Sequence, residues 1–134
     1  MTKKGYIVHL EHQTEKNTDF RRVLYTGKYS QLVLMCLAPN EEIDEETHHD
    51  RDQFFRFEEG EGMVIIDKVP HKVHGGDGAI VPAGALHNII NTSDRLPLKL
   101  YTIYSPPEHI DRTIRRTKKD AEAQPEEYDG KPTE

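Results

Sequence analysis

The chain has 134 residues, of which 34% are hydrophobic and 31% charged, and this length and composition suit one small globular domain. Its formal net charge is −6, and residues 41–62 hold ten acidic side chains against only Arg51 and Arg56, so the charge argues against a nucleic-acid partner, which needs a basic surface. The single cysteine, Cys36, excludes an internal disulfide and fits a reducing compartment.

Targeting and membrane signals are weak in this sequence. Residues 1–4 are not followed by the apolar stretch that a secretion signal needs. No apolar run approaches the roughly 18 residues of a membrane span. We therefore expect a soluble, cytoplasmic, single-domain protein that does not bind membranes.

Short stretches of strand-forming residues recur at intervals of roughly 8–12 residues, separated by Gly, Pro or Asn. No long amphipathic helix lies between them. The pattern predicts an all-β sandwich or barrel. In chain order the predicted strands are residues 6–11, 20–25, 31–38, 53–57, 63–66, 69–73, 79–81, 87–91 and 98–104.

The two ends of the chain give further predictions. Residues 6–11 and 20–25 are expected to pair as a hairpin at the sheet edge, and the nearly continuous apolar run 31–38 predicts a strand buried on both faces. Helix is expected only in the tail, where Thr117 and Asp120 have the spacing of a capping box and a short helix would run to about residue 122. From residue 123 the polar composition predicts disorder or a loosely held tail. Its charges, Glu126 among them, are expected to be solvated.

One stretch has a fixed spacing that stands out from the strand pattern. Between residues 76 and 91 the sequence reads G, five residues, P-x-G, two residues, H, three residues, N, carried by Gly76, Pro82, Gly84, His87 and Asn91. The glycines and the proline are typical turn formers. His87 is the residue of this stretch that can bind a metal.

An earlier run gathers further side chains of the kinds that bind metals. Glu46, His48 and Gln53 follow one another closely, and Gly60 closes the run. These residues lie at or just before the predicted strand 53–57, and His87 lies on the later strand 87–91, so they meet only if the intervening chain folds back. The arrangement predicts a β-barrel with a metal in its mouth.

These two stretches resemble the motifs of the cupin superfamily, small jelly-roll barrels (double-stranded β-helices) that usually hold a divalent metal. The second cupin motif, G(X)5PXG(X)2H(X)3N, is matched at every fixed position by the 76–91 stretch. The resemblance implies a barrel domain over residues 1–116 with its motif core at 40–91, followed by the short helix and polar tail at 117–134.

The first cupin motif, G(X)5HXH(X)3,4E(X)6G, is matched more loosely, and two registers are possible. Counting back from Gly60, one register places Glu46 and His48 in the histidine slots, and the other places Thr47 and His49 there. We favour the first register because Glu46 can bind a metal whereas Thr47 is a poor ligand. In that register Asn40 fills the leading glycine slot, and asparagine tolerates the left-handed backbone that such a slot often marks.

The resemblance implies a set of metal ligands, namely Glu46, His48, Gln53 and His87. Compared with the usual three histidines and one glutamate, a carboxylate replaces the first histidine and an amide replaces the glutamate, so the ligand charge is unchanged. Such nitrogen and oxygen ligands suit one divalent transition metal, such as manganese, iron, nickel or zinc. Gln53 would alternatively orient a bound water. The other interpretations are solvated surface histidines at 48–49, or an intact cupin barrel whose site is empty.

The alternation of side chains along strands then predicts which residues face inward. The residues expected to line a substrate pocket are Met35, Phe55, Phe57, Ile89, Thr102 and Tyr104, and an ordinary barrel core would look the same. Glu46, His49 and Tyr104 are the candidates for a catalytic acid or base. The resemblance also suggests a homodimer formed through the outer sheet, with Phe54 as a possible anchor.

Small cupins include several kinds of protein, and the fold alone does not choose among them. The leading hypothesis is a metal-dependent enzyme acting on a small oxygen-bearing molecule, most similar to the isomerase-type cupins grouped with mannose-6-phosphate isomerase. The alternatives are an iron-dependent dioxygenase and a non-catalytic barrel that binds a metal or a small ligand. An isomerase acting on a phosphorylated sugar needs an inward-pointing basic residue, and the sequence does not place one.

Overall fold

The computed structural model describes residues 2–134, and ten strands and two short helices are assigned within this range. In chain order the elements are α1 (Leu10–Lys16), β1 (Arg21–Thr26), β2 (Gln31–Leu37), β3 (Glu46–Thr47), β4 (Asp52–Glu59), β5 (Glu61–Ile66), β6 (Val69–His74), β7 (Gly78–Val81), β8 (Leu86–Asn91), β9 (Leu98–Ser105), β10 (Ile114–Arg115) and α2 (Lys118–Ala123).

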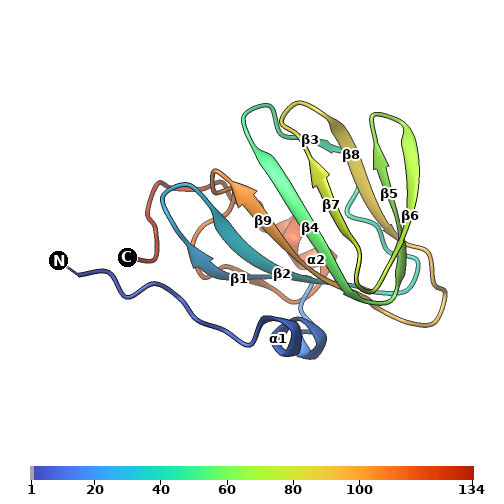
Figure 1. The fold of residues 1–134 in the computed structure, drawn as a ribbon, viewed down its shortest axis with the longest axis horizontal. Coiled ribbons are helices and arrows are strands. Elements are labelled where there is room, and N and C mark those ends of the chain that lie inside the picture. Colours follow the sequence, from blue (N-terminus) through green and yellow to red (C-terminus); the bar gives the residue numbers. More distant parts are fainter. Residues whose placement is uncertain (1) are drawn as a thin grey trace.

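The strands form two antiparallel sheets, which Figure 1 shows as the two layers of the domain. The larger sheet has the order β10-β1-β2-β9-β4-β7, and the smaller one has the order β3-β8-β5-β6. Neighbours such as β2 and β9 are far apart in the sequence, which is the connectivity of a jelly roll. The prediction of an all-β barrel is confirmed. Seven of the predicted strands coincide within a few residues with β1, β2, β4, β5, β6, β8 and β9, and the predicted strand 79–81 falls in β7.

The core lies between the sheets and follows from alternation along the strands. On β9, Leu98, Leu100, Thr102 and Tyr104 are buried while the residues between them are partly exposed, as predicted. The inward side of β4 is buried in the same way. Each fully buried aliphatic or aromatic side chain contributes about 1.5–3 kcal/mol relative to exposure, so this alternation is what holds the two layers together.

The predicted N-terminal hairpin is wrong. Residues 6–11 form no strand, and helix α1 begins at Leu10, so helix is not confined to the tail. The physical reason is that the apolar side chains of this segment have no sheet partner: Ile7 is 97% exposed, whereas Thr14 of α1 is fully buried. Lys99 on the outer face of β9 donates a hydrogen bond to the carbonyl of Glu15 near the end of α1, where a cation is favoured.

Helix α1 lies against the outer face of the larger sheet, where it contacts β9 and β4. The prediction that β2 is buried on both faces is confirmed, because Met35 faces the core and Leu34 faces the opposite side, and each is only 1% exposed. Leu34 lies beside Gln13 and Asn17, in and just after α1.

The C-terminal segment returns to the domain. The predicted tail helix is confirmed as α2, with Thr117 as its N-cap accepting from the amide of Asp120 at 3.0 Å. After α2, Thr133 donates from its backbone amide to Thr26 at 2.8 Å, and the carboxylate of Glu134 accepts from the backbone amides of Lys4 and Gly5 at 2.7 and 2.8 Å. The two ends of the chain therefore lie side by side (Figure 1). The polar composition of the segment after residue 123 did not predict these contacts.

The first and last positions of the first motif have a left-handed backbone. Asn40, in the leading glycine slot, has φ 62°, and Gly60, which closes the first motif, has φ 103°. A Cβ atom at Gly60 would also lie 2.5 Å from the carbonyl oxygen of Pro97. Among the described residues, no helix is long and apolar enough to cross a membrane.

We expect Gly60→Ala to cost roughly 2–4 kcal/mol of unfolding free energy, because it adds a backbone clash to the strain of a positive φ. The matched control is Gly76→Ala: φ is 99° there, but no atom lies within 4 Å of the added Cβ, so roughly 1–2 kcal/mol is expected. Urea unfolding of the two variants measures the difference. Equal losses would show that the contact with Pro97 has no energetic consequence.

Candidate metal centre

Three potential ligands meet at one end of the barrel. Glu46, His48 and His87 each offer an atom, and these atoms all lie within 4.8 Å of one another. The pairing of β3 with β8 places Glu46 directly opposite His87. His48 is two residues beyond Glu46, so the alternation of an extended chain returns it to the same side. We call Glu46, His48 and His87 the cluster.

His87 is held in one tautomer and leaves a nitrogen free. Its Nδ1 lies 3.0 Å from the carbonyl oxygen of Ala85, which can only accept, so Nδ1 carries the proton and donates it. The side chain is buried, and Nε2 has no hydrogen-bond partner within residues 2–134. A neutral imidazole whose second nitrogen is fixed by a backbone carbonyl is the usual state of a metal-binding histidine.

His48 lies between two carboxylates. Its Nε2 is 3.2 Å from Oε2 of Glu46, and its Nδ1 is 3.4 Å from Oε2 of Glu108. The hydrogen bond and charge of Glu46, together with the charge of Glu108, raise the pKa of His48 against the opposing effect of burial. Burial also acts to raise the pKa of Glu46, but the hydrogen bond and charge of His48 outweigh it and leave that pKa lowered. The cluster therefore holds an ionised carboxylate.

Gln53 presents a second buried atom without a partner. Its Nε2 donates to Oγ1 of Thr102 at 3.0 Å, which holds the side chain in place. The Oε1 atom is buried, and no described residue donates to it. On β4, Gln53 sits directly opposite Tyr104 of β9, whose ring centroid is 5.9 Å from that of His48. The amide oxygen is thus an available oxygen ligand beside the cluster.

The residues present fit a divalent transition metal. A buried imidazole nitrogen and a buried amide oxygen both lack hydrogen-bond partners, and an unmade hydrogen bond of this kind costs about 1–3 kcal/mol. Two imidazoles, a carboxylate and an amide oxygen form the mixed nitrogen and oxygen set that manganese, iron, nickel and zinc accept.

The structure does not bring His49 to the cluster. Its side chain is exposed, because β3 ends at Thr47 and the chain turns outward at residues 49–50. Tyr104, in contrast, is only 4% exposed and its ring packs edge-on against His48. Burial raises the pKa of Tyr104 well above its ordinary value, so the phenol keeps its proton.

The residues predicted to line a substrate pocket are all buried. Met35, Phe55, Phe57 and Ile89 are at most 1% exposed and belong to the hydrophobic core between the sheets. Thr102 is buried and bonded to Gln53, and Tyr104 lies next to the cluster. Among these six residues, the last two are therefore the polar groups that reach the site.

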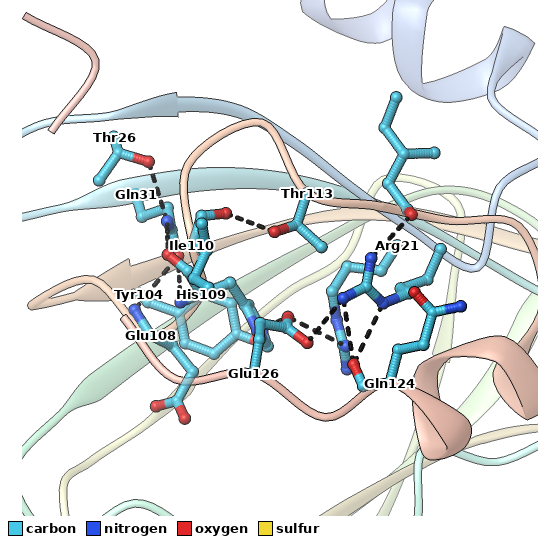
Figure 2. A network of polar contacts seen from close by, with 12 residues as sticks. Arg21, Thr26, Gln31, Tyr104, Glu108, His109, Ile110, Thr113, Gln124 and Glu126 are labelled. Atoms are coloured by element: carbon cyan, nitrogen blue, oxygen red, sulfur yellow. Dashed lines mark hydrogen bonds and ion pairs between the residues drawn. The ribbon is translucent and has the colours of Figure 1, made fainter. Parts of the chain in front are cut away.

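Sequence reasoning missed a group of residues behind Tyr104. His109 is 7% exposed and contacts both Tyr104 and Glu126 (Figure 2). The side chain of Glu126 is only 5% exposed and also lies near Arg21 and Arg115, so the prediction that this tail charge is solvated is wrong. The cause is tertiary, because the tail folds back so that Glu126 contacts His109, Arg21 of β1 and Arg115 of β10. No pattern in the sequence predicts that the C-terminal tail packs against the domain.

A jelly roll whose mouth gathers two histidines and a carboxylate defines a small one-barrel protein with a candidate metal centre. Residues 33–104 match the family model described as Cupin domain, which is more than half of the chain, and the chain belongs to this family. It is a small single-domain cupin.

Relatives of similar sequence support this assignment. The uncharacterized protein YrkC of Bacillus subtilis is 42% identical over 126 residues, which cover 90% of this chain and 67% of that protein. The uncharacterized protein L612 of Acanthamoeba polyphaga mimivirus is 44% identical over 107 residues, covering 78% of this chain and 67% of that protein. The crystal structure of BH2720 from Bacillus halodurans aligns with a TM-score of 0.87 and 39% identity over 90% of this chain and 96% of that one.

The pKa of His48 has a consequence that can be measured. In the metal-free protein the fold favours protonated His48, so this stabilisation is complete below the ordinary pKa of about 6.5 and is lost as the pH rises through the raised value. A metal requires neutral His48, so the apparent affinity for zinc should weaken as the pH falls through that raised pKa.

Histidine NMR of the metal-free protein and zinc calorimetry between about pH 5.5 and 8.5 test this expectation. In Glu46→Gln the pKa of His48 should move back toward its ordinary value, since the largest cause of the shift is removed. An ordinary or lowered pKa for His48 in the unaltered protein would contradict the geometry described here.

Proposed function

We propose that this cupin binds one divalent transition metal through Glu46, His48, Gln53 and His87, and that it is an isomerase- or epimerase-type enzyme acting on a small oxygen-bearing molecule. The metal would be manganese, iron, nickel or zinc. The observation that carries the proposal is the pair of buried atoms without partners, Nε2 of His87 and Oε1 of Gln53, beside the carboxylate of Glu46.

The chemistry of this class suits the groups present. A metal in the site would act as a Lewis acid on two adjacent substrate oxygens and so lower the barrier to an enediol. The chain must then supply a group that takes and returns a proton. Glu46 is ionised and is the candidate when it does not bind the metal. Tyr104 lies at the site but keeps its proton because burial raises its pKa, so it is left out as the base. His49 is exposed and is left out of this proposal.

A basic residue lies near the site, and its guanidinium is paired with Glu126, with Nη1 of Arg21 3.6 Å from Oε1. Arg21 lies on the same side of β1 as the buried Val23, and its Nε is buried without a partner among residues 2–134. Its charge contributes to the lowered pKa of Glu46 and also acts on Tyr104. Sequence reasoning did not place such a residue, because the inward direction of Arg21 depends on the register of β1 with β2.

An iron-dependent dioxygenase is the second candidate. The observation that favours it is the apolar surrounding of His87, whose ring lies 6.3 Å from that of Phe55. Ile89, two residues beyond His87 on β8, is fully buried. A barrel that binds a metal or small ligand without catalysis is the third candidate. The family resemblance also supports a homodimer, with the partly buried Phe54 on the outer sheet as an anchor of the contact. A cytoplasmic location is proposed from the single cysteine, Cys36.

The metal is tested by elemental analysis of the purified protein, which we expect to contain about one transition metal ion per chain. In His87→Ala the bound metal should be lost, because no other described residue offers the nitrogen that Nε2 supplies. His49→Ala is the matched control, since it removes an exposed histidine next to His48 and should leave the metal in place.

Three results would contradict this assignment. Loss of metal in His49→Ala would indicate the other register of the first motif, and retention of metal in His87→Ala would show that the metal is bound elsewhere. A purified protein that neither contains metal nor takes it up would favour the non-catalytic candidate.

The reaction class is tested with iron-loaded and manganese-loaded protein in deuterated water. With a panel of small hydroxy-aldehydes and hydroxy-ketones, with and without a phosphate group, we expect NMR to detect solvent deuterium at the carbon next to the carbonyl. Reversible proton removal from that carbon is the step that an isomerase performs. Oxygen uptake by the iron-loaded protein without deuterium incorporation would instead establish the dioxygenase candidate.

A further inference from the structure

Three buried side chains form a line of hydrogen bonds behind the cluster (Figure 2). Oε1 of Glu126 lies 2.8 Å from Nδ1 of His109, and Nε2 of His109 lies 3.2 Å from the hydroxyl of Tyr104. The rings of Tyr104 and His109 meet edge-on, with centroids 5.1 Å apart. The line runs from the C-terminal segment, through the loop after β9, to the end of β9 beside His48.

The middle residue is anchored through its backbone. Gln31 is only 1% exposed. Its Oε1 accepts hydrogen bonds from the backbone amides of His109 at 2.9 Å and Glu108 at 3.1 Å. Its Nε2 donates to the backbone carbonyl of His109 at 2.7 Å. A buried glutamine that uses both ends of its amide on one loop fixes that loop strongly. The position of the imidazole of His109 is therefore built into the fold.

The order of the protons along this line follows from the chemistry of each group. The carboxylate of Glu126 can only accept, so Nδ1 of His109 carries a proton and donates it. A neutral imidazole then has an unprotonated Nε2, which accepts the hydroxyl proton of Tyr104. Burial lowers the pKa of His109 and so favours its neutral form. Burial also acts to raise the pKa of Glu126, but the hydrogen bond from His109 and the charges of Arg21 and Arg115 leave that pKa lowered.

A tyrosine whose proton points away from the site offers only its oxygen lone pairs to the site. We propose that Tyr104 acts at the cluster as a hydrogen-bond acceptor, that His109 and Glu126 are the positioning residues that keep it so, and that the site consequently selects small molecules with an O–H group next to the oxygen that binds the metal. This specificity rests on the proposed function, since it requires a metal at the cluster. It narrows the substrate class to hydroxy-carbonyl and hydroxy-acid compounds.

The first test needs no metal and uses the full chain labelled with nitrogen-15. NMR of the histidine rings should show His109 with a protonated Nδ1 and an unprotonated Nε2, and Tyr104→Phe should shift the Nε2 signal. Glu126→Ala should lose the single tautomer, whereas Glu126→Gln should keep it, because the amide oxygen still accepts from Nδ1. Glu127→Ala is the matched control, since it alters an exposed neighbouring carboxylate. A protonated Nε2 in the unaltered protein would overturn the inference.

The second test uses the cobalt-loaded protein and two probes, glycolate and methoxyacetate, which differ in whether the oxygen next to the carboxylate carries a proton. The unaltered protein should bind glycolate more tightly, and Tyr104→Phe should weaken glycolate about five- to tenfold, the usual size of one hydrogen bond, without changing methoxyacetate. His109→Leu should weaken glycolate as well. In the double variant it should add nothing further, which is the signature of a residue acting through Tyr104.

The outcomes separate this inference from the proposed function. If the unaltered protein does not bind cobalt, the proposal of a metal site is itself contradicted, and with it the proposed function. If cobalt binds, three results would overturn the role assigned to Tyr104 and His109 and leave the metal site intact. The first is that glycolate does not bind, and the second is that Tyr104→Phe affects the two probes equally. The third is that the effects of Tyr104→Phe and His109→Leu on glycolate binding are additive.

Discussion

The alternation of side chains along paired antiparallel strands is the constraint on which the site depends. Glu46 faces His87 because β3 pairs with β8 in one register, and Gln53 faces Tyr104 because β4 pairs with β9 in one register. A slip of one residue in either pair would turn these side chains to the outer face. The apolar residues that continue the same inner faces, such as Phe55 and Ile89, oppose any such slip, because it would expose them. The core and the site are therefore specified by the same register.

The buried polar atoms of the site also lower the free energy of unfolding of the metal-free protein. Buried polar atoms in proteins are nearly always hydrogen-bonded, yet Nε2 of His87 and Oε1 of Gln53 have no partner in the described part of the chain. Both groups are held by a bond at their other end, to Ala85 and Thr102 respectively. Side chains that are fixed in place with their lone pairs unused are prearranged for a ligand, and a bound cation would convert this cost into stabilisation.

Much of the fold and part of the candidate site could be predicted from the sequence. The spacing from Gly76 to Asn91 and the inward faces of β4 and β9 depend on local pattern, and the structure places them as that pattern predicts. Helix α1 was missed because it is short and polar and is stabilised by its contact with the outer sheet, such as the bond from Lys99. His109 and Glu126 were missed because their burial depends on a loop and a tail that return from far along the chain, and the polar composition of the tail predicted that Glu126 is solvated.

The central claim is that Glu46, His48, Gln53 and His87 converge on a single cation. The most direct measurement is an anomalous difference map from crystals of the zinc-loaded protein, recorded on both sides of the zinc absorption edge. The account predicts one strong peak about 2.0–2.1 Å from a nitrogen of each of His48 and His87, with oxygens of Glu46 and Gln53 completing the protein ligands. No peak at this position, or a peak only among surface histidines such as His71 and His74, would contradict it.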